Sequence, residues 1–130
     1  DSIELEYPSY YLEDIDEFEL ASSDINDLEG VEFCKHAKIL DLSDNHIDDL
    51  TLLFGLNYLE NLNLSDNEIS EIDVLSNLLN LKLIDLSNNN IDDIFPIMDL
   101  PKLEYVNLLG TQVGEKQVEE LRGLGVIVDI

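Results

Sequence analysis

The stretch that decides the fold is LKLIDLSNNNIDDIFPIMDLPK, residues 81–102. Places are counted from the first residue of each segment. The preceding segment, residues 59–80, has aliphatic residues at the same places, 1, 4, 6, 11, 14, 17 and 20, and shares asparagine at place 9. The frame extends back through residues 37–58 and, with serine at place 9, through residues 15–36. With residues 103–124, this makes five consecutive units of one length, which is typical of a solenoid.

Within each unit, places 4 and 6 predict a short strand with inward aliphatic side chains, as at Leu62 and Leu64. Successive strands should stack in parallel about 4.8 Å apart. The place-9 residues Asn45, Asn67 and Asn89 are then expected to lie above one another and to bind backbone groups at the bend, a structural role. Four large apolar residues of the return segments are expected to pack over the edge of the core: Phe33, Phe54, Tyr58 and Met98.

The frame L-x-x-L-x-L-x-x-N-x-I resembles the leucine-rich repeat. The units are similar to the short repeats of bacterial internalins and of a phosphatase regulatory subunit, since place 11 is Ile, place 13 is acidic and place 14 is Ile or Leu. These residues read IDDL from Ile47, ISEI from Ile69 and IDDI from Ile91. Pro96 stands where internalin units often have proline, and LEGV from Leu28 looks like their LEGI stretch.

The resemblance covers residues 15–113 and implies an α/β leucine-rich repeat solenoid. A curved parallel sheet should line its concave face, with short helical or irregular returns on the convex side. The class binds very different proteins, so the resemblance does not identify a partner.

Length and charge narrow the possible functions. The 130 residues fit one domain, and thirty acidic residues against six Lys and Arg give a formal net charge of −24. Nucleic acid and anionic lipid are therefore poor direct partners. Halophilic adaptation is an alternative source of the acidity, which the many Ile and Asn residues do not favour.

No apolar run approaches the ~18 residues of a membrane span. The chain starts at Asp1 without a leader pattern, which indicates either a removed signal or a segment of a longer protein.

Both ends depart from the frame. Residues 1–14 are expected to form an N-terminal cap, because a terminal unit otherwise exposes its core. A contact site for a partner is the alternative for the aromatic residues of that segment. Residues 15–124 form the five repeats, and residues 115–124 of the last repeat predict a short helix that packs one face on the solenoid. Residues 125–130 predict the terminal strand of a sixth, partial unit.

The sequence predicts no enzyme, no cofactor and no metal site. Cys34 falls at a core place and is expected to be a small buried hydrophobe. His36 and His46 fall on different sides of the solenoid, and no Ser-His-Asp or Cys-His set converges on the frame. The aspartates of residues 41–49 lack the glycine and terminal glutamate of an EF-hand calcium loop.

Partner binding is expected on the concave face, where places 3 and 5 point, with places 8 and 10 at its rim. From place 3 to place 13, the five units contain half of the thirty acids and no Lys or Arg. The predicted partner-binding residues are Glu17, Ile39, Asn61, Leu83, Tyr105 and Ile127 at place 3; Glu19, Asp41, Asn63, Asp85, Asn107 and Asp129 at place 5; and Asp44, Asp66, His46 and Glu68 at the rim.

Two interpretations of these acids are open. Either they solvate the surface of a soluble repeat protein, or they form an acidic concave face that receives a basic protein. The exclusion of Lys and Arg favours the second, with Tyr105 as the apolar anchor. The predicted function is thus a protein-interaction module, expected to be a monomer.

The resemblance to internalins implies recognition at a bacterial surface or after secretion. The alternative is a cytoplasmic inhibitor or immunity protein that neutralises a basic enzyme such as a nuclease, by analogy with ribonuclease inhibitor, another acidic leucine-rich repeat protein.

Overall fold

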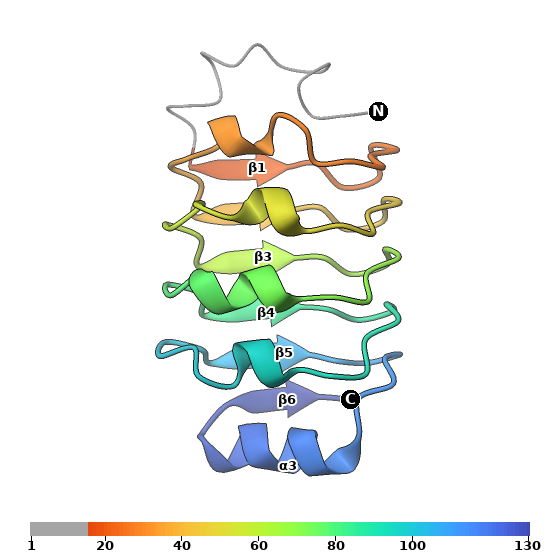
Figure 1. The fold of residues 1–130 in the computed structure, drawn as a ribbon, viewed down its shortest axis with the longest axis vertical. Helices are drawn as coiled ribbons and strands as arrows, with labels where there is room; N and C mark the ends of the chain where they lie inside the picture. The colour runs from red at the N-terminus through yellow and green to blue at the C-terminus, as the bar shows by residue number, and fades with distance from the viewer. Residues whose placement is uncertain (1–15) are drawn as a thin grey trace.

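A computed structural model describes residues 16–130 as one row of stacked units (Figure 1). Each unit contributes a short strand to a parallel sheet whose spatial order follows the chain. Neighbouring strands pair at an offset of 22 residues, as Glu17 does with Ile39, so each place lies beside the same place of the next unit. Within the described residues the strands are β1 Glu17–Glu19, β2 Ile39–Asp41, β3 Asn61–Asn63, β4 Leu83–Asp85, β5 Tyr105–Asn107 and β6 Ile127–Asp129.

The returns are short helices on the convex side, and in Figure 1 they lie in front of the strands. The 3-10 helices are η1 Val31–Phe33, η2 Thr51–Leu53, η3 Asp73–Asn77 and η4 Phe95–Ile97, and the one α-helix of the described residues is α3 Glu115–Gly123. The acid at place 13 starts two of these turns, because Asp49 Oδ1 accepts from Thr51 N at 2.9 Å and Asp93 Oδ1 from Phe95 N at 2.9 Å. In these two units the acid at place 13 therefore has a structural role.

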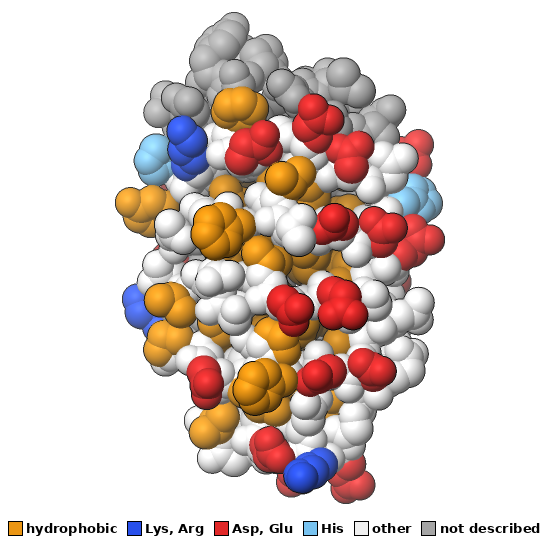
Figure 2. Space-filling model, in the orientation of Figure 1, with side chains coloured by type: hydrophobic (Ala, Val, Ile, Leu, Met, Phe, Trp, Pro, Cys, Tyr) orange, Lys and Arg blue, Asp and Glu red, His pale blue; other side chains and the backbone are white. Residues whose placement is uncertain are grey.

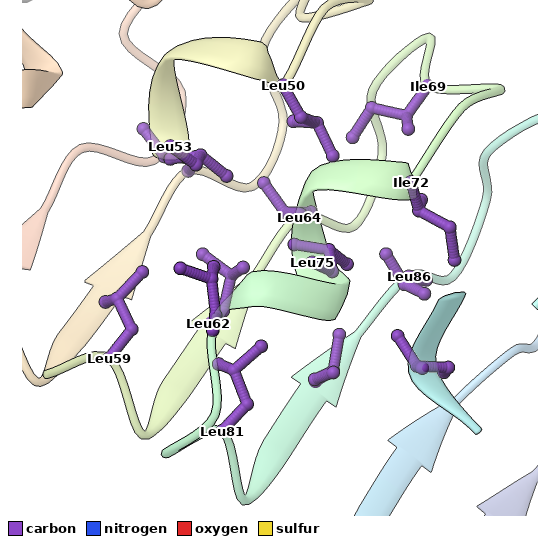
Figure 3. Packing of buried hydrophobic residues seen from close by; sticks show 14 of the residues in the cluster. Leu50, Leu53, Leu59, Leu62, Leu64, Ile69, Ile72, Leu75, Leu81 and Leu86 are labelled. Atoms are coloured by element: carbon purple, nitrogen blue, oxygen red, sulfur yellow. The ribbon is translucent and has the colours of Figure 1, made fainter. Parts of the chain in front are cut away.

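The core is a continuous aliphatic stack between the sheet and the returns. Residues such as Leu62, Leu64 and Leu75 are completely buried. Figure 3 shows side chains from successive units meeting in this stack. Each fully buried Leu or Ile stabilises the fold by roughly 1.5–3 kcal/mol. Because each unit shares its core with its neighbours, a charged residue at one of these places would disrupt at least two units.

The asparagines at place 9 join adjacent units through their amides. Asn89 Oδ1 accepts from Ile69 N of the preceding unit at 3.0 Å, and its Nδ2 donates to Leu64 O at 2.9 Å and Leu86 O at 3.1 Å. Asn67 and Asn45 make the same kinds of bond. The ladder thus satisfies buried backbone groups at each bend.

The last full unit ends the ladder. Thr111 stands at place 9, and its hydroxyl donates to Leu108 O at 2.7 Å. Helix α3 follows and buries Val118 and Leu121 against the solenoid. No helix of the described residues is long and apolar enough to cross a membrane. The proposed cap, residues 1–14, lies outside the described residues.

The prediction that four convex apolar residues pack over the edge of the core is confirmed for two of them. Phe33 and Met98 are partly buried against the core. The prediction is wrong for Phe54 and Tyr58, which are 69% and 54% exposed. The core places on either side are already filled, as Leu53 shows for the position before Phe54. These two rings therefore point outward, and Tyr58 instead lies 5.7 Å from the ring of His36.

Candidate protein-binding face

The sheet brings places 3 and 5 of all the strands onto one surface, called here the concave face. Place 3 forms a mainly apolar column in which Ile39 is 37% exposed, Leu83 39% and Ile127 66%. Asn61 and Tyr105 are partly exposed in the same column. The pairing of Leu83 with Tyr105, and of Tyr105 with Ile127, makes the C-terminal half of this column continuous and apolar.

Place 5 has a structural role that the sequence analysis missed. Asp85 Oδ1 accepts from both Ser87 N at 2.9 Å and Ser87 Oγ at 2.6 Å, which closes the turn after β4. Asp41 bonds Ser43 in this way, and the amide oxygen of Asn63 bonds Ser65. The turn needs an acceptor at place 5, and either Asp or Asn supplies it. Asp differs from Asn in bringing a negative charge to the concave face.

Tyr105 is held by a partner from the next unit. Its hydroxyl donates to Asp129 Oδ2 at 2.7 Å. That hydrogen bond, followed by partial burial and the negative charges of Asp129 and Asp85, raises the pKa of Tyr105 to about 12. The ring is therefore oriented before any partner arrives, and its proton is directed at Asp129.

The rim acids at place 8 occupy a special backbone conformation. Asp44 and Asp66 have φ of 53° and 56°, in the left-handed region that short polar residues tolerate better than most. Asp44 Oδ2 accepts from Ser22 Oγ at 2.7 Å, and Asp66 Oδ1 accepts from Asn88 Nδ2 at 3.0 Å. These two acids therefore support contacts between units, besides adding charge to the rim.

The remaining rim residues lie at place 10. His46 Nε2 is 3.1 Å from Asp24 Oδ1 of the preceding unit. Glu68 is exposed two units further on from Asp24. The structure therefore places all the predicted rim residues along one edge of the concave face.

The acids of the concave face are not paired with Lys or Arg within residues 16–130. Lys82 pairs with Glu60 at 3.4 Å, and Arg122 pairs with Glu119 at 3.7 Å, both away from places 3 and 5. The carboxylates of Asp41 and Asp85 keep one oxygen beyond the turn bonds described above. The concave face therefore presents negative charge that no ion pair with Lys or Arg offsets within these residues.

The one cysteine of the chain, Cys34, is buried in the core. Burial, and to a lesser degree the charge of Glu32, raises the pKa of Cys34 to about 12, so the thiol stays protonated. No group of three or more His, Cys, Asp or Glu among residues 16–130 could hold a metal ion.

The repeat pattern and the stacked parallel sheet define a leucine-rich repeat solenoid. The family model for leucine-rich repeats in two copies matches residues 79–123, and the single leucine-rich repeat model matches residues 58–78. The chain therefore belongs to the leucine-rich repeat proteins, and its repeats are internalin-like. This fold is a general protein-interaction scaffold that binds through its extended concave surface. A comparison with curated protein sequences finds no match.

Among solved structures, the chain is similar to two internalins and to a chain of a Drosophila complex. Internalin C2 of Listeria monocytogenes is 29% identical with a TM-score of 0.82, over 96% of this chain and 56% of that chain. An internalin of the same organism, InlF, is 25% identical with a TM-score of 0.73, over 87% of this chain and 40% of that chain. The Drosophila melanogaster SNF/U2A′ complex contains a chain that is 27% identical with a TM-score of 0.66, over 83% of this chain and 64% of that chain. The chain thus spans about half the length of the internalins it resembles.

Proposed function

We propose that the chain is a binding module whose concave face receives a protein with a basic surface. One observation carries this proposal. The exposed apolar column at place 3 runs directly beside the carboxylates of Glu19, Asp41, Asp85 and Asp129, and no Lys or Arg neutralises them in the described residues. An apolar centre edged by unpaired charges of one sign is suited to a partner with an apolar patch surrounded by cations.

The two columns should contribute to binding in different ways. Tyr105 is a large ring already fixed by Asp129, so little side-chain freedom is lost when a partner covers it. Leu83 and Ile127 extend the contact on both sides of the ring. The carboxylates act over a longer range and should mainly accelerate association.

The similarity to internalins supports recognition at a bacterial surface or after secretion as the setting. The same chemistry would also suit a cytoplasmic inhibitor of a cationic enzyme. The partner's identity separates the two roles. A surface receptor supports the first, and a basic enzyme whose activity falls on stoichiometric addition of this chain supports the second.

The experiment uses matched baits. The parent chain, Tyr105→Ala, Asp41→Asn and the convex control Asn77→Ala are immobilised, and proteins retained from candidate cell extracts are quantified. Asp41→Asn keeps the oxygen that binds Ser43, so it removes charge with little effect on the turn. A true partner should be retained equally by the parent and by Asn77→Ala, and recovered in smaller amounts on Tyr105→Ala. When its association rate is measured, it should bind Asp41→Asn more slowly than the parent. Equal retention by every bait, or loss on Asn77→Ala alone, would contradict the concave-face assignment.

A further inference from the structure

A second exposed apolar surface lies on the convex side, opposite the concave face. We call it the convex apolar column: Leu52, Phe54, Val74 and Phe95. Phe54 and Phe95 are 69% and 71% exposed, and Leu52 is 43% exposed. Val74 lies partly buried on η3, between η2 and η4. Figure 2 shows the larger apolar side chains of this face over η2 and over η4, with less apolar surface over η3 between them.

The fold does not require these residues to be apolar. Phe95 stands at place 15, which is Glu29 in the first unit and Asp73 in the third. Phe54 stands at place 18, which is Glu32 in the first unit and Ser76 in the third. Polar side chains therefore satisfy the same backbone positions elsewhere in the chain. Apolar residues that gather on a surface without a structural need indicate an interaction site.

Acids border this column on one side. Asp48, Asp49, Glu71 and Asp73 line an open hollow of about 420 Å³ together with Leu50, Thr51 and Val74. Val74 belongs to both features, so the hollow opens directly beside the column. No Lys or Arg lines it. Figure 2 shows acidic side chains following the apolar ones along this face.

Charge selects among the occupants that could cover this surface. A second copy of the chain would bring another formal charge of −24 against the same acids, and an anionic lipid surface would also be repelled. A metal ion lacks a ligand set, since residues 16–130 contain no suitable group of His, Cys, Asp or Glu. A partner with cationic side chains beside apolar ones matches both the column and the hollow.

We propose that the convex apolar column and the adjoining acidic hollow bind a cationic amphipathic helix of another protein. The spacing fits, because an α-helix rises 5.4 Å per turn and stacked units are about 4.8 Å apart. A helix lying along the solenoid would place one apolar side chain per turn on η2, η3 and η4 in succession. Lys or Arg on the adjacent helical face would reach Asp48 and Glu71. This surface is separate from the concave face and does not depend on the function proposed for it.

The test uses a fluorescent synthetic peptide of roughly 18 residues, or five helical turns. It has Leu at i, i+3, i+4 and i+7 spacing and Lys elsewhere, and a scrambled peptide of the same composition serves as the control ligand. Affinity is measured by anisotropy on the folded chain. Phe54→Ala/Phe95→Ala leaves the charge unchanged and should raise Kd about tenfold or more. Asp48→Asn/Glu71→Gln should raise Kd severalfold at low salt and much less at high salt.

The matched control truncates two exposed apolar residues that belong to neither surface, Leu79→Ala/Leu124→Ala, and should leave Kd within about twofold of the parent. Thermal melts establish that each double variant is folded. Equal affinity for the scrambled peptide, or an unchanged Kd in Phe54→Ala/Phe95→Ala, would overturn the proposal. So would a loss of affinity confined to the control variant Leu79→Ala/Leu124→Ala, or a dimer in sedimentation that the two Phe substitutions dissociate.

Discussion

The hydroxyl of Tyr105 donates to the carboxylate of Asp129 at 2.7 Å, across the boundary between two units. Tyr105 lies at place 3 of β5, and Asp129 lies at place 5 of the adjacent strand β6. The residue predicted as the apolar anchor of the concave face is thus oriented by one of the acids beside it. This contact joins the two columns of that face.

The first prediction separates the ring of Tyr105 from its hydroxyl. Tyr105→Ala should weaken a concave-face partner by roughly 2 kcal/mol or more, while the chain stays folded. Tyr105→Phe keeps the ring and should lose much less affinity. Calorimetric titration with a purified partner measures both values. If the two substitutions weaken binding equally, the ring is not the anchor. If neither does, Tyr105 only covers the edge of the sheet.

The second prediction concerns alkaline pH. The pKa of Tyr105 is raised to about 12 in the folded chain, chiefly by its hydrogen bond to Asp129, against 10.0 for an ordinary tyrosine. The folded state therefore holds the proton more tightly than the unfolded state does. The resulting stabilisation is present below pH 10 and is lost as the pH rises through about 12. In a tyrosinate absorbance titration of the folded chain, one tyrosine should ionise at higher pH than the others. Asp129→Asn should lower the pKa of that tyrosine toward the ordinary value of 10.0. A single unshifted transition in the parent would contradict this.

The third prediction concerns the asparagine ladder. Asn67→Ala removes one amide that binds backbone groups of two units, and should lower the free energy of unfolding by about 1–3 kcal/mol. Asn90→Ala, at an exposed position of the next unit, is the control and should change it by less than about 0.5 kcal/mol. Chemical denaturation measures both. Matching midpoints for Asn67→Ala and the parent would show that the ladder does not stabilise the stack.

The fourth prediction compares two glycines. Gly110 has φ of 72°, and a Cβ there would collide with the side chain of Asn88, so Gly110→Ala should destabilise the chain by about 1–3 kcal/mol. Gly123 ends α3 with nothing near the position of a Cβ, so Gly123→Ala should be neutral or stabilising by up to about 1 kcal/mol. The melting temperature should therefore fall for Gly110→Ala and stay equal or rise for Gly123→Ala. A fall in melting temperature for both variants, or none for Gly110→Ala, would show that space and backbone conformation do not decide the outcome.

The fifth prediction follows from the formal charge of −24. Repulsion among the acids should lessen as salt is added, because screening acts within about 8 Å at physiological ionic strength. The melting temperature should therefore rise from low to moderate salt, equally for sodium and potassium chloride. An unchanged melting temperature would mean that the acids are already well separated in the folded chain.

The register of this fold could be predicted because constant spacing fixes which residues stack. The burial of Leu62 and Leu64 follows from that spacing alone. The role of Asp85 in its turn could not be read from charge, since an acid on a strand that faces a binding surface looks like a contact residue. A serine two residues after each of Asp41, Asn63 and Asp85 was the available signal.

The outward direction of Phe54 was harder to foresee. A large aromatic residue between two core positions usually gains by covering them. Here Leu53 and Leu56 already fill the space beneath the return. Whether room remains for Phe54 depends on packing across neighbouring units and not on the local sequence. The bond between Tyr105 and Asp129 could have been predicted, because places 3 and 5 of neighbouring strands lie diagonally opposite on one face once the register is known.

The turn after each middle strand requires an oxygen at place 5 and is indifferent to the charge of the side chain that carries it. Asp and Asn are therefore interchangeable there as far as folding is concerned. A lineage of such proteins could alter the charge of its binding face one repeat at a time, through single substitutions that selection for stability would not oppose. New specificity for differently charged partners could arise on this scaffold without any compensating change in its core.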